Sequence, residues 1–282
     1  MTSTVFLAVL FAAVLHAVWN ALVRSGADKA LSMSAVMVGH VPFALIALCF
    51  VPAPAPESWF LIGLSVVLHL GYQIFLMNAY RIGDLTQVYP IARGTAPMLV
   101  AGVSTVFLGV ELVWLEVVAI LTIGIGLLSL ALARGGDGLR DSKVGLLAFA
   151  TGCFIAGYSL VDGTGARLAG TSLGFYAWSS MINATIFALF IRWRHPGTLR
   201  RLPTEGRMML LIGGGGSFLA YAIVTWAFTQ VPIALVTALR ETSIVFALII
   251  GTLFLKERMN SAKAFSIFVT LLGAIMLRIA RL

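Results

Sequence analysis

Three ionisable residues, Arg93, Arg240 and Glu241, lie deep within stretches that are otherwise apolar. A charged side chain at the centre of a membrane costs about 2.5–3.5 kcal/mol on insertion scales, so such a residue faces a watery cavity or a charged partner. Adjacent residues of a helix point about 100° apart, which prevents Arg240 and Glu241 from pairing squarely. We therefore expect Glu241 to contact Arg93, and we expect at least one arginine to hold an acidic group of a ligand. The alternative is a structural ion network that only fixes helix packing.

Aromatic and polar residues recur at helical spacing on other apolar stretches. His69, Tyr72 and Gln73 share one face, because residues three and four positions apart are neighbours on a helix. A cavity lined by aromatic rings with a few polar groups is the usual form of a small-molecule site. Interhelical hydrogen bonding or interfacial anchoring explains each of these residues, taken alone, more simply. The candidate substrate-binding residues are Arg93, Arg240, Glu241, Trp19, Asn20, Tyr72, Gln73, Tyr89, Tyr158 and Tyr221, and the candidate coupling residues are Glu241, His16 and His69.

Two prolines, Pro90 and Pro97, flank Arg93 in the same stretch. Proline has no backbone N–H, so Pro97 leaves the carbonyl of Arg93, and Pro90 that of Thr86, without a helical donor. We expect the helix to bend near Arg93 and to expose backbone carbonyls, as the binding segments of transporters do. The alternative is that the prolines only shape helix packing.

The composition requires an apolar solvent. Of the 282 residues, 60% are hydrophobic and only 11% are charged, and the mean hydropathy is +1.01, which leaves too little charge to cover a water-soluble surface. The net charge of +8 does not indicate nucleic acid, because most Lys and Arg residues flank the apolar stretches. There they set topology and meet lipid headgroups. The expected partners are the bilayer and a small-molecule substrate, with either a monomer or a homodimer as the assembly.

Several kinds of chemistry find no support in the sequence. Cys49 and Cys153 lack the spacing of metal ligands, and the four histidines are scattered, so we expect no metal site, no cofactor and no enzymatic activity. No phosphate-binding loop is present either. The energy for any transport must then come from a gradient or from a separate partner.

About 20 apolar residues cross a membrane as a helix. On that criterion ten spans are predicted, at 3–23, 31–51, 58–80, 86–109, 112–133, 143–162, 172–192, 207–229, 233–255 and 260–280. The first span runs on into His16 and Trp19 and has no basic leader, so we interpret it as a retained helix rather than a signal peptide.

The basic residues predict the orientation. The loops after the odd-numbered spans hold fourteen Lys and Arg residues, whereas the opposite side holds only Arg167, Arg278 and Arg281. Basic loops remain in the cytoplasm. We therefore expect a multi-pass protein of the inner or plasma membrane with both termini outside the cytoplasm, against which Arg278 and Arg281 are the dissenting residues.

The two halves of the chain, 1–141 and 142–282, resemble each other. Five of sixteen positions match between 93–108 and 240–255, including the buried pair Arg93 and Arg240. Each half has five spans, an odd number, so the second half must enter the membrane upside down. The predicted fold is therefore an all-α membrane protein of ten transmembrane helices in two inverted five-helix repeats, with a binding site between the halves.

These features resemble the EamA-like family of the drug/metabolite transporter superfamily over essentially the whole chain. The resemblance rests on the doubled layout, on the string Tyr89-Pro-Ile-Ala-Arg-Gly-Thr-Ala-Pro97, which marks one subgroup, and on Ala238-Leu-Arg-Glu-Thr242. It implies cytoplasmic termini with a basic loop after the second span. Here that loop is Pro52-Ala-Pro-Ala-Pro-Glu57 and has no Lys or Arg, which favours the opposite orientation.

The leading hypothesis is a secondary transporter that moves a small anionic or zwitterionic metabolite by alternating access. Arg93 and Arg240 would hold an acidic group, and Glu241 would balance charge or meet an amine. Export is implied by the resemblance alone. The alternatives are a lipid-headgroup flippase of the same fold and an exporter of cationic drugs, whose pocket should be rich in carboxylates.

Overall fold

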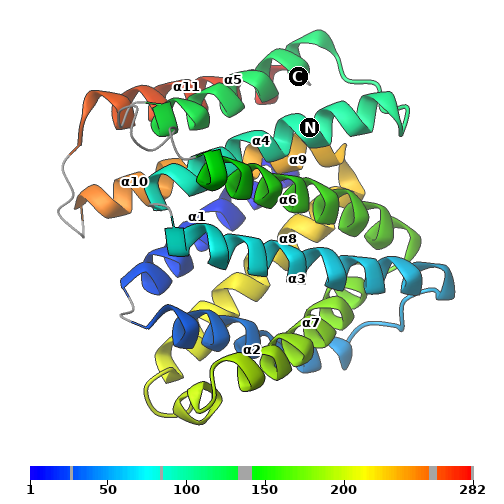
Figure 1. The fold of residues 1–282 in the computed structure, drawn as a ribbon. Coiled ribbons are helices and arrows are strands. Elements are labelled where there is room, and N and C mark those ends of the chain that lie inside the picture. The colour runs from blue at the N-terminus through cyan, green and yellow to red at the C-terminus, as the bar shows by residue number, and fades with distance from the viewer. Residues whose placement is uncertain (26–27, 83–84, 133–141, 254–258, 281–282) are drawn as a thin grey trace.

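The computed structural model describes residues 1–25, 28–82, 85–132, 142–253 and 259–280, and every regular element within them is helical (Figure 1). The long helices are α1 (Ser3–Ser25), α2 (Lys29–Leu48), α3 (Trp59–Ile82), α4 (Leu85–Val106), α5 (Trp114–Leu132), α6 (Ser142–Leu168), α7 (Ser172–Arg194), α8 (Gly214–Gln230), α9 (Ile233–Arg240), α10 (Ser243–Leu253) and α11 (Ser261–Ile279). The short elements are η1 (Pro56–Ser58), η2 (Thr198–Arg201) and the π-helical η3 (Met209–Gly213).

Nine helical stretches among the described residues are long and apolar enough to cross a membrane, which makes this a multi-pass membrane protein. Three of the nine combine elements, because η1 continues into α3, η3 continues into α8, and α9 is followed by α10. The predicted span outside this set is α4, which has 22 residues. Its length suffices, but Arg93 and its polar neighbours lower its mean hydropathy.

Two of the predicted spans differ from the structure in ways that affect the site: one boundary is wrong, and one span contains a break that was not predicted. The span predicted at 143–162 continues to Leu168 as α6, which moves Asp162 from the end of a helix into its interior. The span predicted over 233–255 is interrupted after Arg240, and a new helix begins at Ser243. The other predicted spans agree with the described helices within three residues at each end.

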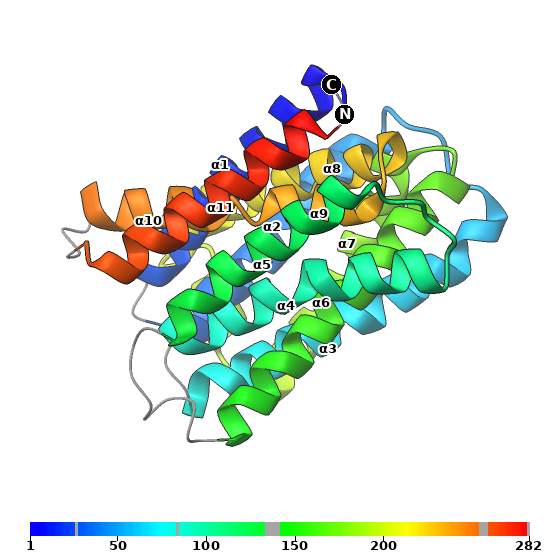
Figure 2. The same cartoon turned by 90° about the horizontal axis from the view of Figure 1, so that it is seen from above.

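The helices run alternately in opposite directions across the bundle (Figures 1 and 2). One end of the bundle holds the last turns of α1, α3, α5, α7 and α10. The other end holds the last turns of α2, α4, α6 and α8, together with the first turn of α1 and the last turn of α11. Both termini therefore lie at the same end.

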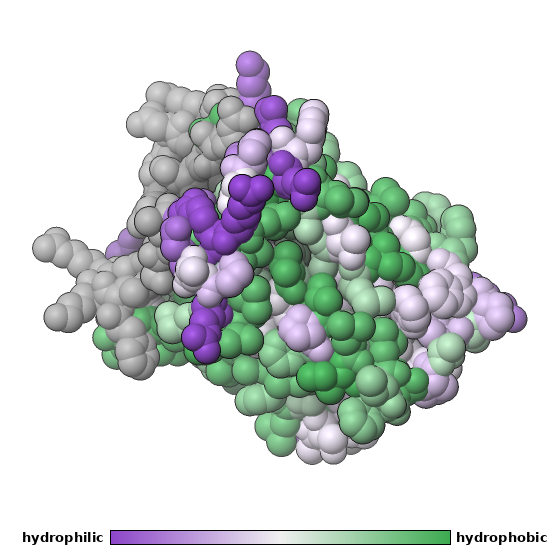
Figure 3. Space-filling model, turned by 90° about the horizontal axis from the view of Figure 1, so that it is seen from below, coloured by the Kyte–Doolittle hydropathy of each residue, from purple (hydrophilic) through white to green (hydrophobic). Residues whose placement is uncertain are grey.

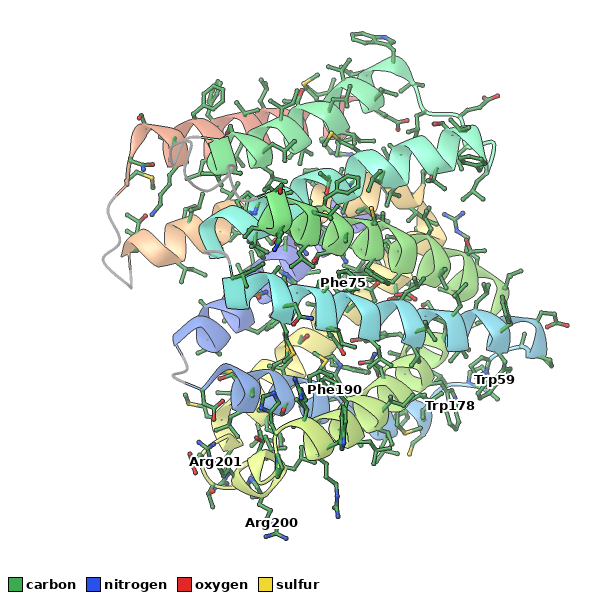
Figure 4. The ribbon with its side chains drawn as sticks, in the orientation of Figure 1. Trp59, Phe75, Trp178, Phe190, Arg200 and Arg201 are labelled. Atoms are coloured by element: carbon green, nitrogen blue, oxygen red, sulfur yellow. The ribbon has the colours of Figure 1, made fainter. Side chains whose placement is uncertain are left out.

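Different residue types mark the two ends. Arg200 and Arg201 lie at the end where α7 finishes, whereas Trp59 and Trp178 pack together at the opposite end with their ring centroids 5.3 Å apart (Figure 4). On the face seen in Figure 3, hydrophilic residues gather mainly along one side of a largely hydrophobic surface. Basic residues and tryptophans at the ends of an apolar body are typical of a protein that meets two headgroup layers.

The long helices pack in pairs, with α5 on α11, α2 on α7, α1 on α8, and both α3 and α4 on α6. Glycines bring some of these backbones close together. A Cβ added at Gly39 would collide with the backbone oxygen of Leu210, and one added at Gly214 would lie 2.7 Å from the Cα of Gly39. A Cβ at Gly273 would lie 2.9 Å from the backbone oxygen of Ala119. Small residues at such crossings let helices approach without intervening side chains.

Arg278, which lies on the side predicted to have few basic residues, has a structural role. Arg278 donates from Nη1 to the backbone oxygen of Met1 at 2.6 Å and from Nη2 to the Ser3 hydroxyl at 2.8 Å. It thereby joins the end of α11 to the start of α1. Its position is explained by these contacts whichever side of the membrane it faces.

A second cluster joins two loops at the basic end. Asp28 caps α2 by accepting from the backbone N–H of Leu31 at 3.0 Å, and it forms an ion pair with Arg201 at 2.8 Å. Arg201 also pairs with Glu205 at 2.6 Å. The N–H of Leu31 and the guanidinium of Arg201 hold the pKa of Asp28 below its ordinary value.

The crossing of α2 and α8 predicts that Gly39→Ala is destabilising. Overpacking typically costs about 1–3 kcal/mol, because the added methyl must push the backbone of Leu210 away. The control is Gly63→Ala in α3, where nothing lies within 4 Å of an added Cβ, so helix propensity alone should make that variant neutral or slightly more stable. Thermal unfolding in detergent measures both variants. Equal melting temperatures for the two would contradict the close crossing.

The Asp28 cluster predicts a pH-dependent contribution to stability. A lowered folded-state pKa stabilises the protein fully above the unfolded-state pKa, about 3.9, and this stabilisation is lost as the pH falls through the folded-state pKa. Asp28→Asn keeps a capping side chain but removes the charge. The variant should melt below wild type at pH 7 by the equivalent of less than about 1 kcal/mol, because the cluster is solvent-exposed. This difference should shrink towards pH 3, and a constant difference would argue against the ion pair.

Candidate functional site

Arg93 and Glu241 form an ion pair between α4 and the segment that joins α9 to α10. Arg93 Nε lies 2.6 Å from Glu241 Oε2, and the two side chains are 6% and 1% exposed. Arg93 also donates from Nη2 to the Ser243 hydroxyl at 3.1 Å. The predicted contact between Arg93 and Glu241 is thus confirmed. The short distance and the burial of both side chains make this a direct, charge-compensating contact.

The helix break places the charges of Arg240 and Glu241 at opposite helix ends. α9 finishes at Arg240 and α10 starts at Ser243. Between them, the backbone N–H of Glu241 donates to the carbonyl oxygen of Ala238 at 3.1 Å. The hydroxyl of Thr242 donates to the carbonyl oxygen of Leu239 at 2.7 Å. A cation is stabilised at a helix C-terminus and an anion at a helix N-terminus. The break therefore gives each residue the end that suits its charge.

The interruption occurs in a different helix from the one predicted to be irregular. Pro90 and Pro97 lie within α4, which remains a single helix from Leu85 to Val106, whereas α9 and α10 separate at a position without proline or glycine. The sequence of this turn, Arg-Glu-Thr, is charged and polar within an apolar span. In place of proline or glycine, the turn is stabilised by its own backbone hydrogen bonds and by the contact between Arg93 and Glu241.

Arg240 lies farther from the Glu241 carboxylate than Arg93 does. Its Nε lies 3.9 Å from Glu241 Oε1, which is too long for a hydrogen bond, and its side chain is 3% exposed. Neither Nε nor Nη2 finds a hydrogen-bond acceptor among the described residues. The guanidinium carbon lies 5.7 Å from the centre of the Tyr221 ring, a contact that stabilises the charge without using its N–H groups. Arg240 is therefore a buried cation whose Nε and Nη2 nitrogens have no hydrogen-bond acceptor among the described residues.

The tyrosines and His69 from four helices gather beside this cation. His69 of α3 stacks on Tyr158 of α6 at 4.1 Å between ring centroids and meets Tyr221 of α8 edge-on at 5.6 Å. Tyr72 lies 5.7 Å from Tyr158, and Tyr176 of α7 lies 5.1 Å from Tyr221. The predicted aromatic residues of separate spans thus form one cluster.

The remaining candidates divide into those at the cluster and those elsewhere. The ring of Tyr89 lies 5.6 Å from the guanidinium carbon of Arg93, and His16 lies within electrostatic reach of both arginines. Trp19 packs edge-on against His16 at 5.0 Å. Two candidates point elsewhere. Asn20 donates to the His16 carbonyl of its own helix at 2.8 Å, and Gln73 donates to Asn183 of α7 at 3.0 Å.

Asp162 is a buried carboxylate that sequence patterns place on one helix face with Tyr158 but that the candidate site residues do not include. Its Oδ2 lies 2.9 Å from Nε2 of His69 and accepts a 2.6 Å hydrogen bond from the Tyr221 hydroxyl. The pattern that indicates this position is Tyr158 four residues earlier on one helix face. Ending the predicted span at 162 hid its meaning, because a carboxylate at a helix end needs no partner.

The charged cluster is closed to the surface in this structure. Arg93 is 5% exposed and Arg240 is 3% exposed. Two surface cavities lie elsewhere. One, of about 320 Å³, lies between α2 and α7 and includes Val38 and Arg192, and the other, of about 460 Å³, lies between α3 and α7 and includes Asn78 and Arg194. In the described part of the chain, no three His, Cys, Asp or Glu residues come together to hold a metal ion.

Comparisons with known proteins agree with this architecture. Residues 143–279 match the EamA-like transporter family, so a domain of that family occupies the second half of the chain. A protein of known crystal structure is similar over 99% of both chains, with a TM-score of 0.79 and 20% identity. At that identity the likeness shows a shared fold. A search of curated proteins returned no match.

The different environments of the two arginines predict different effects on stability. Arg93→Gln should destabilise the ligand-free protein by about 3–5 kcal/mol, because it leaves Glu241 buried without its counter-ion. Arg240→Gln should destabilise less, because Arg240 Nε lies 3.9 Å from the Glu241 carboxylate whereas Arg93 Nε lies 2.6 Å from it. Thermal unfolding in detergent without added substrate tests both variants. Equal destabilisation would instead place Arg240 in a structural ion network.

Proposed function

We propose that this protein is a secondary transporter that moves a small anionic or zwitterionic metabolite by alternating access of two inverted halves. The observation that carries the proposal is Arg240, a cation held in the core of a membrane protein with donors that no described residue uses. Burying a charge without full compensation is costly. A protein that keeps such a group needs it for something other than folding.

The two halves contribute equivalent elements to the cluster. Arg93 lies on the fourth span and Arg240 on the ninth, and the pairing of helices is consistent with an exchange of the halves. If α1 corresponds to α6 and α3 to α8, the contact of α1 with α8 corresponds to the contact of α6 with α3. The contacts of α2 with α7 and of α5 with α11 each join two corresponding helices. Each of these pairs joins one half to the other, so a rocking motion between halves would open the cluster to either side.

The chemistry of the cluster favours an acidic substrate group. A carboxylate, sulfonate or phosphonate would accept from Nε and Nη2 of Arg240 in the planar geometry that arginine offers. Arg93 would add a second positive charge nearby, although its pairing with Glu241 partly neutralises it. Glu241 would meet the amine of a zwitterion, and the rings of Tyr72, Tyr158 and Tyr221 would line the apolar part of the site.

The two alternatives fit this arrangement less well. An exporter of cations needs a carboxylate free to meet its substrate, whereas Glu241 is paired with Arg93 and Asp162 lies against His69. A lipid-headgroup flippase needs its arginines open sideways to lipid, whereas Arg93 and Arg240 are buried.

We also propose that both termini lie outside the cytoplasm, in the inner or plasma membrane, with the basic loops inside. The end of the bundle that carries Arg200 and Arg201 would face the cytoplasm. Export is the direction that the family resemblance favours.

Uptake into proteoliposomes tests the proposed function with a panel of lactate, methanesulfonate, methylphosphonate, alanine and taurine. Wild type should take up at least one member, and Arg240→Ala should weaken its apparent affinity by about tenfold to a hundredfold, the loss expected for hydrogen bonds to a charged group. Arg194→Ala, which removes an exposed arginine at the end of α7, is the matched control and should transport normally. Unchanged transport in a folded Arg240→Ala variant would refute the assignment of the site.

A further inference from the structure

Asp162 is held by two partners from two other helices. His69 of α3 lies 2.9 Å from its Oδ2 and Tyr221 of α8 donates to the same oxygen at 2.6 Å. The other oxygen, Oδ1, is buried and has no hydrogen-bond partner among the described residues. The side chain of Asp162 is 2% exposed, whereas that of His69 is 21% exposed. The imidazole is therefore partly exposed at the surface of the bundle, whereas the carboxylate is buried.

Tyr221 connects this pair to the arginine site. Its hydroxyl donates a hydrogen bond to Asp162 Oδ2, and the centre of its ring lies 5.7 Å from the guanidinium carbon of Arg240. The ionisable groups on the elements packed against α6 include His69 and Tyr72 on α3, Arg93 and Tyr89 on α4, Tyr176, Arg192 and Arg194 on α7, Tyr221 on α8, Arg240 on α9 and the exposed Glu57 of η1. On α6 itself they include Lys143, Cys153, Tyr158 and Arg167. Of these, His69 is the histidine within hydrogen-bond distance of Asp162, at 2.9 Å from Nε2 to Oδ2.

The charges of the cluster cancel when His69 is neutral. Arg93 and Arg240 carry two positive charges, and Glu241 and Asp162 carry two negative charges. A bound monoanion would leave this buried region with one excess negative charge. An uncompensated charge in such a place is strongly disfavoured, and a group nearby gains a proton instead.

We propose that the pair of His69 and Asp162 is the coupling site of the transporter and takes up one proton for each monoanion that binds at Arg240. The proton comes from solvent, binds His69 Nε2 and is shared with Asp162 Oδ2, so that the loaded cluster is again neutral. When the anion leaves on the other side, the proton leaves with it. The proton and the anion therefore cross together without net charge. This inference rests on the proposed function.

The experiment uses wild type in proteoliposomes with methanesulfonate, lactate or methylphosphonate at pH 6, whichever of these monoanions it carries fastest. A one-unit pH gradient, acid outside, should accumulate the anion about tenfold, because one-for-one coupling transmits the whole gradient. A membrane potential set with potassium and valinomycin should not change that ratio. The same final level with and without the gradient would overturn the coupling and leave the transporter proposal standing.

Variants then locate the coupling. Asp162→Asn and His69→Gln should lower accumulation from about tenfold to about onefold, while exchange of labelled for unlabelled anion at equal pH continues. His40→Gln is the matched control, because His40 is a buried histidine beside Tyr176 and Phe218 at 6.4 and 6.0 Å between ring centroids, and it should keep the tenfold ratio. A tenfold ratio in Asp162→Asn would overturn the assignment.

A measurement without variants covers the case in which Asp162→Asn does not fold. Binding of the anion to wild type in weakly buffered detergent should remove about one proton per site from solution, as a pH dye would report. Binding without proton uptake would overturn the coupling alone. If no member of the panel binds or is taken up, both the proposed function and the coupling fail.

Discussion

The ion pair between Arg93 and Glu241 is the contact on which the centre of this bundle depends. It joins α4 of the first half to the turn between α9 and α10 of the second half, and both partners are almost fully buried. In a membrane neither charge is tolerable alone. The pairing therefore ties α4 to the turn between α9 and α10 and compensates the charge of Arg93, whereas two nitrogens of Arg240 have no hydrogen-bond acceptor among the described residues.

The break between α9 and α10 follows from the same constraint. An unbroken helix would point Arg240 and Glu241 in directions about 100° apart and would give neither the favourable end of a helix dipole. Ending one helix at Arg240 and starting the next at Ser243 lets Glu241 reach Arg93 while Arg240 stays beside Tyr221. The irregular backbone stands within the bundle, where other helices surround it, which is the only setting in which a membrane tolerates it.

Sequence patterns predicted the helices well and the site in part. Hydropathy located the long helices because each needs about 20 apolar residues, and the contact between Arg93 and Glu241 followed from the cost of buried charge. The break at Glu241 was not predicted because the turn contains no proline or glycine. The contact that stabilises the break comes from α4, which is distant in sequence. Asp162 was left out of the candidate site because its partners, His69 and Tyr221, are distant in sequence. Gln73 has the right helical face for the cluster, yet Asn183 of α7 binds it instead. The orientation and the inverted repeat remain predictions.

The crossing of α2 and α8 limits which residues can occupy positions 39 and 214. At Gly39 and Gly214 the two backbones touch directly, so neither position can gain a side chain unless the helices separate. A separation there would also displace Trp19, which packs near Gly216 on the same helix as Gly214. Positions 39 and 214 should therefore covary among relatives, with both small where the crossing is kept and both larger where it has opened.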